Sequence, residues 1–328
     1  MKNNIYTGVA LIGLIALGTG VMFLRDKEDE TVKIGVIAPL TGIVAAYGEE
    51  IKKGVESADI SGVSVVFEDD QCDPKLAVNA FRKLTELDGV RFIIGPACGS
   101  SQEAIVPLLK DKEILVLVPA AASQKLFEQS GGNFFNMQYS LEDESTFLAG
   151  KMYERGLRNV ILISYQNAFS KTHRDTFVAN FKGTIVKEII YVDATSDVSS
   201  ELVKIKDLPH DAIFSTDISF FFANGLEKLR QFGIITPVFS QYAVELPAVR
   251  SLVEGVAYSF PDDISESEGA ARSLARESAD LMVKLVTQCE GVYLCVKSNL
   301  AQNGFVNGVK QRELVLKEIK NASPTRVE

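Results

Sequence analysis

The fold is decided by two stretches of sequence, EDDQCDPKLAV at residues 68–78 and FIIGPACGSS at residues 92–101. An apolar, β-branched run, Val63–Phe67, leads into the first stretch, and Phe92–Ile94 opens the second, as is typical of strands buried on both faces. Between them, apolar residues recur at helical spacing: Ala77, Ala80, Phe81 and Leu84. The pattern predicts a strand, a helix and a second strand parallel to the first.

A cysteine follows each of these two strands. Parallel strands end at the same edge of a sheet, so Cys72 and Cys98 are expected to lie close together there, and ligands of open α/β folds bind outside that edge. We predict a disulfide at a ligand-site edge, with two buried free thiols as the alternative. Such a disulfide stabilises the fold by roughly 3 kcal/mol in the chain-entropy model.

Length and composition point to a globular protein of two domains, since the chain has 328 residues, of which 46% are hydrophobic and 23% charged. Its 43 acidic and 34 basic residues give a net charge of −9, and the basic residues are scattered along the sequence. Nucleic-acid-binding proteins carry basic patches, so this composition argues against a nucleic-acid partner.

The N-terminal region contains 20 uncharged residues, Ile5–Leu24, followed by the charged sequence RDKEDE. A helix of this length can span a bilayer. No small-x-small cleavage site follows Phe23, so we predict a signal anchor over residues 1–30, with a cleaved signal peptide as the alternative. In either case the body of the protein is expected outside the cytoplasm, where a second disulfide would join Cys289 and Cys295.

Strand-like runs alternate with helical patterns along most of the chain. The runs are Val32–Ala38, Val63–Phe67, Phe92–Ile94, Ile114–Val118, Val160–Ser164, Ile185–Val192, Ala212–Ser215 and Val238–Ser240. This alternation predicts an α/β fold with parallel sheets and helices on both faces. A break at Gly131–Asn136 is followed by a helix start at Ser140–Glu144, so two Rossmann-like lobes are expected.

The last seventy residues contain a helical pattern over Ser267–Leu285 and a shorter one before Asn299. Two short strand-like segments follow, Gly304–Asn307 and Leu314–Ile319. Their lengths suit elements that complete the two lobes.

Three parts of the sequence resemble a known family: KIGVIAPLTGIVAAYGEEIKKGVESA at residues 33–58, the pair EDDQCDP and IIGPACGSS, and ILVLVPAAASQKL at residues 114–126. In order and spacing they are similar to type I periplasmic binding proteins, in particular the leucine/isoleucine/valine-binding group of branched-chain amino acid transport. The resemblance covers residues 32 to 320 and is carried mainly by the part up to Phe135. It implies two lobes that close on a small ligand, without a cofactor and without catalysis.

The family's three-crossing hinge would fall near Tyr139, Pro261 and Asn307. The resemblance therefore implies the following division: 1–30 anchor, 31–140 and 262–305 first lobe, 141–261 and 306–320 second lobe, 321–328 tail. In such proteins ligand contacts from both lobes bias a hinge motion toward the closed state.

In the first lobe, the resemblance implies that Tyr47 covers the ligand and that two turns bind it. The turn positions are Ala97, Gly99, Ser100, Ser101, Ala120, Ala121, Ala122 and Ser123. Backbone N–H groups at such turns suit a carboxylate, and the serines add hydroxyl donors. The chain departs from the amino acid binders at Gly99, where they have serine, and at Ala122, where they have threonine.

In the second lobe, the resemblance implies ligand contacts from Phe169 and Ile218. It places Tyr242 at the position of the acidic residue that receives the ligand ammonium, and Asp217 is a candidate replacement. A buried ammonium group without a partner costs several kcal/mol, so a small amide or carboxylate is expected if Asp217 points elsewhere.

Other polar and aromatic groups have structural interpretations. We expect a solvated strand end with a capping aspartate, not a metal site, at the acidic residues Glu68, Asp69, Asp70 and Asp73. His173 and His210 lie in no ligand motif, so surface or capping roles are predicted, and the run Phe220–Phe222 is expected to pack in the core. Since there is no G-x-S-x-G sequence or acid/base pair, an enzyme is not predicted.

The sequence thus predicts an extracytoplasmic solute-binding protein that delivers a small ligand, such as an aliphatic amino acid, amide or carboxylate, to an ABC transporter permease, held at the membrane by its N-terminal helix. The alternative is a membrane-anchored sensory or partner-binding ectodomain of the same fold with altered or lost ligand binding.

Overall fold

The computed structural model describes residues 31–192, 198–222, 224–264 and 269–327. Within these ranges, no helix combines the length and the apolar composition needed to cross a membrane. The signal anchor predicted over residues 1–30 lies outside the described residues.

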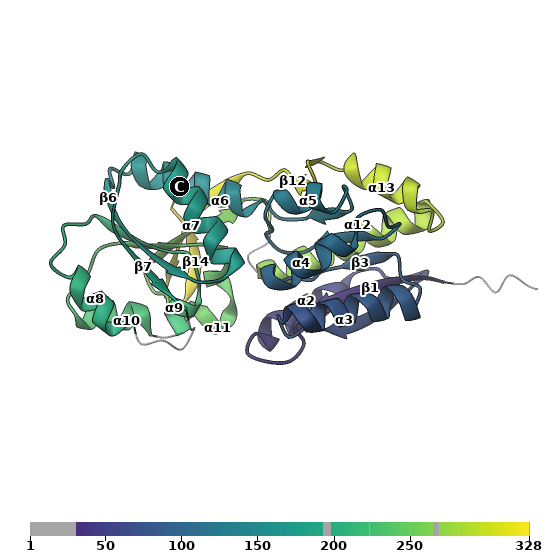
Figure 1. The fold of residues 1–328 in the computed structure, drawn as a ribbon, viewed down its shortest axis with the longest axis horizontal. Helices are drawn as coiled ribbons and strands as arrows, with labels where there is room; N and C mark the ends of the chain where they lie inside the picture. Colours follow the sequence, from purple (N-terminus) through teal and green to yellow (C-terminus); the bar gives the residue numbers. More distant parts are fainter. Residues whose placement is uncertain (1–30, 193–197, 223, 265–268, 328) are drawn as a thin grey trace, which may run out of the picture. The chain divides into compact units, whose positions relative to one another are not determined.

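The first sheet has seven strands in the order β11-β12-β5-β4-β3-β1-β2. Figure 1 labels its strands β1, β3 and β12. Its central strands are parallel, with Ile34 opposite Phe92 and Phe92 opposite Leu115. The elements up to the first crossing are β1 (Val32–Ala38), α2 (Ala45–Ser57), β2 (Val63–Asp69), α3 (Pro74–Arg82), the π-helical turn η1 (Lys83–Leu87), β3 (Phe92–Ile94), α4 (Gly99–Ile105), the 3₁₀ turn η2 (Val106–Leu108), β4 (Leu115–Val118), α5 (Lys125–Gln129) and β5 (Phe134–Asn136).

C-terminal elements complete this first lobe: α12 (Ala270–Gln288), α13 (Tyr293–Ala301), β11 (Phe305–Val306) and β12 (Val309–Lys310). The long helix α12 packs against α2 and against β3 and β4. One face of α12 is apolar because residues such as Leu274, Met282 and Val286 recur at helical spacing, and all three are buried.

The second sheet has the order β14-β13-β10-β9-β8-β6-β7. Figure 1 labels its strands β6, β7 and β14. The elements of this second lobe are α6 (Leu141–Glu154), β6 (Asn159–Tyr165), α7 (Ala168–Asn180), β7 (Thr184–Tyr191), α8 (Ser199–Ile205), β8 (Ala212–Ser215), α9 (Ser219–Phe222), α10 (Gly225–Gln231), β9 (Val238–Ser240), the 3₁₀ turn η3 (Tyr242–Glu245), α11 (Pro247–Arg250), β10 (Val256–Pro261), β13 (Leu314–Lys320) and β14 (Ser323–Arg326). Its core joins Leu148 of α6 and Phe177 of α7 to Phe214, Phe239 and Leu316 of the sheet.

All eight predicted strand runs form strands, and the helices predicted near Ser267–Leu285 and before Asn299 are present as α12 and α13. The sheets are mostly parallel, but not entirely as predicted, because β13 pairs antiparallel with both β10 and β14, and β11 pairs antiparallel with β12. Four strands were not predicted: β5, β10, β12 and β14. β12 has only two residues. β5 and β14 are short and lie among turn residues, and Ala, Ser and Pro interrupt the apolar run of β10.

The chain passes between the two sheets three times: between β5 and α6, between β10 and α12, and between β12 and β13. The first two passages follow Asn136 and Pro261, near the predicted crossings. The third was predicted near Asn307, but Asn307 lies in the β11–β12 hairpin, and Val309 of β12 pairs with Asn136 of β5 in the first sheet. This passage therefore lies at residues 311–313, and part of the predicted tail forms β14.

Arg312 links the three passages. Its Nε donates to the carbonyl oxygen of Met137 in the first passage, at 2.8 Å, and its Nη atoms bind Asp263 in the second passage and Glu277 of α12. The Arg312 side chain is 1% exposed. A buried guanidinium with three acceptors fixes its neighbours in one geometry, so the three hinge segments are joined through one side chain.

Candidate functional site

The first-lobe part of the candidate site lies where β2, β3 and β4 end. Cys72 follows β2 and Cys98 follows β3, and the two cysteines form the predicted disulfide, with Cα atoms 5.4 Å apart. Asp73 caps α3, because its carboxylate accepts from the backbone N–H groups of Lys75 at 2.8 Å and Leu76 at 3.0 Å. The predicted capping role of Asp73 and the predicted disulfide at the sheet edge are thus confirmed. The second predicted disulfide, between Cys289 and Cys295, is also present.

Asp70 differs from the solvated acid that the sequence predicts. Its side chain is fully buried, and burial raises the pKa of its carboxyl group although the backbone N–H of Cys72 donates to it at 3.3 Å. Ser101, also fully buried, lies beside it at the start of α4. The acidic run therefore contributes one capping residue and one residue of the buried edge.

The serines of the two predicted turns bind neighbouring protein groups. The Ser100 hydroxyl donates to the carbonyl oxygen of Cys72 at 3.0 Å. The Ser123 hydroxyl donates to a carboxylate oxygen of Glu142, at 2.5 Å, and the Gln124 N–H donates to the other oxygen at 3.1 Å. At the start of α4, the first backbone N–H groups have no acceptor within the helix, which leaves them as donors for a ligand.

Two predicted contacts from different lobes meet at the tyrosine pair. Tyr47 lies in the first turn of α2 and Tyr242 begins η3, and a hydrogen bond joins their hydroxyl groups. Burial raises the pKa of Tyr47 to about 12 and the pKa of Tyr242 well above its ordinary value. The Tyr242 hydroxyl also accepts from the N–H of Ala121, so the second predicted turn is part of this cluster.

A small cavity of about 30 Å³ adjoins the tyrosine pair, lined by Tyr47, Tyr242 and nearby residues including Glu50, Glu245 and Arg272. This is room for one or two water molecules. The Tyr242 ring also stands edge-on to Tyr139 in the first passage, with centroids 6.2 Å apart.

Phe169 and Gly99 also meet. A Cβ atom placed on Gly99 at the start of α4 would lie 3.6 Å from the Cβ of Phe169, in the first turn of α7. A serine at position 99 would therefore touch this aromatic residue at ordinary van der Waals distance. The Phe169 ring stands edge-on to His173, with centroids 4.6 Å apart.

Asp217 and Ile218 follow β8 in the second lobe. Asp217 is 6% exposed, and its carboxylate accepts from the side-chain amide of Asn167 at 3.1 Å. Asn167 in turn caps α7, since its side-chain oxygen accepts from the Ser170 N–H at 2.7 Å. Asp217 thus binds the start of the helix that carries Phe169, and Ile218 is half-buried beside it.

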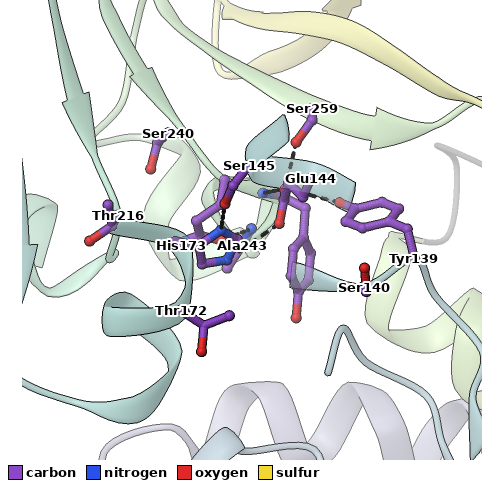
Figure 2. A network of polar contacts seen from close by, with 12 residues as sticks. Tyr139, Ser140, Glu144, Ser145, Thr172, His173, Thr216, Ser240, Ala243 and Ser259 are labelled. Atoms are coloured by element: carbon purple, nitrogen blue, oxygen red, sulfur yellow. Dashed lines mark hydrogen bonds and ion pairs between the residues drawn. The ribbon is translucent and has the colours of Figure 1, made fainter. Parts of the chain in front are cut away.

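A buried polar network that the sequence did not predict supports these contacts (Figure 2). One carboxylate oxygen of Glu144, Oε1, accepts from the Tyr139 hydroxyl at 3.1 Å, from the Tyr242 N–H at 2.9 Å, and from the Ser259 hydroxyl. The other oxygen, Oε2, lies 3.5 Å from Nε2 of His173. Glu144 and His173 are both fully buried.

The surface or capping role predicted for His173 is therefore wrong, whereas His210 is half-buried in a loop, where it contacts the Leu208 carbonyl and the Thr236 hydroxyl. A signal for His173 was present in the sequence. On α7 it shares one helical stripe with the buried Ser170 and Phe177, and Glu144 shares a stripe of α6 with Leu141 and Leu148. The core role expected for Phe220–Phe222 is confirmed for Phe220 and Phe221, which are both buried, while the side chain of Phe222 lies outside the described part of the structure.

Metal binding finds no support in the part of the chain that the structure describes, because no three His, Cys, Asp or Glu side chains are grouped to hold an ion. What the described site offers is a set of backbone N–H donors in the first lobe, near aromatic side chains of both lobes. Such an arrangement can bind a small anion that carries an apolar body.

Residues 31–257 match the periplasmic binding protein family. The Leu/Ile/Val-binding protein BraC3 of Rhizobium johnstonii is 28% identical over 198 residues, which cover 56% of this chain and 53% of that protein. The chain thus spans about half the length of the curated relatives that it matches first.

Two solved structures share the fold. The leucine binding protein LivK from Thermotoga maritima MSB8 has a TM-score of 0.81 at 17% identity, covering 90% of this chain and 98% of that one. A solute binding protein of an ABC transporter from R. palustris, in complex with benzoate, has a TM-score of 0.78 at 17% identity, covering 90% and 95%. The resemblance found in the sequence is confirmed, and because the match spans more than half of its residues, the chain belongs to the periplasmic binding protein family.

Proposed function

We propose that this protein is an extracytoplasmic solute-binding protein, which closes its two lobes on a small ligand and delivers it to an ABC transporter. The observation that carries the proposal is the meeting of predicted contacts from the two sheets, Tyr47 with Tyr242 and Gly99 with Phe169. A ligand that touches both lobes favours the closed state by its difference in affinity for the closed and open states. The protein's role is binding, without catalysis.

The proposed ligand is a carboxylate or amide on an apolar body, including branched-chain and other aliphatic amino acids. The names of the similar proteins include Leu/Ile/Val, leucine and benzoate as ligands, all of which have a carboxylate next to an apolar group. The residues proposed to contact the ligand are Tyr47, Ala97, Gly99, Ser100, Ser101, Ala120, Ala121, Ala122, Ser123, Phe169, Asp217, Ile218 and Tyr242.

We also propose that Ile5–Leu24 tethers the protein to the membrane. The support is the sequence alone, 20 uncharged residues followed by a charged segment. A tether keeps the receptor near a permease and raises its effective concentration there.

The second candidate function is a sensory or partner-binding ectodomain. The observation in its favour is the tyrosine pair, which leaves a cavity of only about 30 Å³ where Tyr47 and Tyr242 meet. Two lobes that contact each other through their own side chains can adopt the closed state without a solute, and a partner protein can then bind that state.

A thermal-shift screen of the full-length protein distinguishes the two functions. The ligands are leucine, isoleucine, valine, isobutyrate, benzoate and isobutyramide, and a binder at 100 times its Kd stabilises the folded state by about 2.7 kcal/mol. We expect at least one of them to raise the melting temperature, and calorimetric titration then gives the Kd. No shift with any of the six supports the sensory or partner-binding function.

A pair of variants tests where the ligand binds. Phe169→Ala removes an aromatic contact of the candidate site, and we expect it to abolish most of the ligand-induced shift. Phe147→Ala removes a partly buried aromatic of the same lobe that packs on the core of that lobe instead. Equal shifts in both variants would place the ligand elsewhere.

A further inference from the structure

The buried pair Glu144 and His173 has one feature that packing does not explain. Apart from each other, Glu144 Oε2 and His173 Nε2 have no polar neighbour within hydrogen-bonding distance in the described structure, and they face each other at 3.5 Å. The second ring nitrogen of His173, Nδ1, lies 2.7 Å from the Ser145 hydroxyl, which can donate or accept (Figure 2). Unpaired polar atoms in a fully buried site are costly, which favours a proton placed between Oε2 and Nε2.

Two arrangements place a proton there without charging the imidazole. In the first, ionised Glu144 accepts from Nε2–H, and Nδ1 accepts from Ser145. In the second, protonated Glu144 donates from Oε2 to Nε2, and Nδ1–H donates to Ser145. The second arrangement contains one proton more. It forms when a proton from solvent is taken up at Nδ1 and the Nε2 proton moves to Oε2, while the Ser145 hydroxyl turns.

The other oxygen of Glu144 connects this chemistry to the hinge. Oε1 accepts from Tyr139 in the first passage, from the N–H of Tyr242 beside the small cavity, and from Ser259 on β10, two residues before that strand ends at Pro261. Hydrogen bonds to an ionised carboxylate are about twice as strong as those to a neutral group. Neutralising Glu144 therefore weakens all three bonds together.

We infer that Glu144 and His173 titrate as one unit, and that the proton they take up loosens the contacts that tie the hinge and Tyr242 to Glu144. The direction of the pKa values agrees with this geometry. Burial raises the pKa of Glu144 to about 7 and lowers the pKa of His173 to about 3. The carboxyl group thus takes up the proton near neutral pH, and the imidazole stays neutral.

The other titratable groups near the pair do not change charge in the same pH range or are paired. Tyr139 and Tyr242 have pKa values raised well above 10, so both stay neutral. Among the elements packed on α6, β10 carries Tyr258, whose hydroxyl donates to Glu245, and β13 carries Lys317, whose Nζ lies 3.8 Å from Glu245. On the α4 side of α7, Glu103 is paired with Lys125 at 3.0 Å.

Nitrogen NMR of the full-length protein with ¹⁵N-labelled histidine tests the inference directly. The chain has two histidines, so His210 serves as an internal reference. We expect His173 to be neutral at both pH 5 and pH 8.5, with its N–H on Nδ1 at pH 5 and on Nε2 at pH 8.5. A His173 imidazolium at pH 5, or the same tautomer at both pH values, would overturn the inference.

The pH dependence of stability provides a second test, because the free energy of unfolding should change with pH in opposite directions in two variants. In Glu144→Gln only His173 titrates, with a pKa of about 3 when folded and an ordinary value of 6.5. The stability that neutral His173 contributes is fully present above pH 6.5. It is lost as the pH falls, because His173 takes up a proton in the unfolded state but not in the folded state. Relative to wild type, the unfolding constant should rise by up to about tenfold per pH unit between pH 6.5 and 4.5.

In His173→Gln only Glu144 titrates, with a pKa of about 7 when folded and an ordinary value of 4.5. Here the folded state binds the extra proton, so stability is lost as the pH rises, and the unfolding constant should rise by up to about tenfold per unit from pH 4.5 to 6.5. In wild type the two contributions cancel over this range. Equal losses at every pH in both variants would mean a purely structural role and would refute the inference, which depends on neither ligand nor transporter.

Discussion

The two lobes support their candidate ligand contacts in different ways. In the first lobe, small residues of two strand-end turns are held by backbone geometry and by the disulfide between Cys72 and Cys98, all within a continuous part of the sequence. In the second lobe, Tyr242 is held by one buried carboxylate, Glu144, which also binds residues from the first passage and from β10. The first lobe should therefore tolerate most single side-chain changes at its edge, whereas the second should depend strongly on one.

The largest expected effect is that of Glu144→Ala. It leaves the buried donors of Tyr139, Tyr242 and Ser259 without their acceptor, and each unsatisfied buried donor costs about 1 to 3 kcal/mol. We expect a loss of about 4 kcal/mol in the free energy of unfolding, measured by urea denaturation.

The matched control is Glu154→Ala on the same helix, where the side chain is 66% exposed and paired with Lys151. An exposed pair of this kind contributes less than about 1 kcal/mol. If both variants lose the same small amount of stability, the second lobe does not depend on Glu144 and the contrast between the lobes disappears.

The same contrast explains what could be predicted from the sequence. The first lobe follows from local signals, because the β-branched runs mark the strands, Asp73 and Pro74 mark the start of α3, and the cysteines follow two neighbouring strands. Tyr47 and the turns near Gly99 and Ala121 were found through their resemblance to a family. The burial of Asp70 was not predicted, because a run of acidic residues at the end of a strand ordinarily indicates solvent-exposed side chains.

The network of the second lobe could not be predicted because its members are far apart in the sequence. Ser259 lies 115 residues from Glu144, and Tyr242 lies 98 residues from it. Helical periodicity places Glu144 and His173 on apolar stripes of α6 and α7, but it does not say that the stripes face each other. The third hinge passage was misplaced for a similar reason, since only pairing of Val309 with β5 assigns the β11–β12 hairpin to the first sheet.

The disulfides are expected to have the next largest effect and to differ from each other. Cys72 and Cys98 are separated by 26 positions, and Cys289 and Cys295 by 6. In the chain-entropy model, replacing the first pair by serine costs about 3 kcal/mol and replacing the second pair costs about 2 kcal/mol. Urea denaturation of the two double variants measures both values. A larger loss for the second pair would mean that native-state contacts, and not the closed loop, determine the contribution of each disulfide.

The smallest expected effect is that of the hydrogen bond between the hydroxyl groups of Tyr47 in the first lobe and Tyr242 in the second lobe. A neutral hydrogen bond contributes about 1 kcal/mol, so Tyr47→Phe, Tyr242→Phe and the double variant should give a coupling energy of about 0.5 to 1 kcal/mol in a double-mutant cycle. Because the pKa of Tyr47 is about 12, that of Tyr242 is higher than usual, and Glu144 is ionised above its pKa of about 7, the coupling should be the same at pH 8.5 and pH 9.

Tyr293→Phe is the control for this cycle, since its hydroxyl donates to Asn133 within the first lobe. Combined with Tyr47→Phe it should be additive, because distant sites without shared partners are independent. A coupling of zero between Tyr47 and Tyr242 would mean that the two lobes are not held together by the tyrosines in solution. The space between the lobes would then be open to a ligand, and the small cavity beside the tyrosine pair would no longer favour a receptor that closes without a ligand.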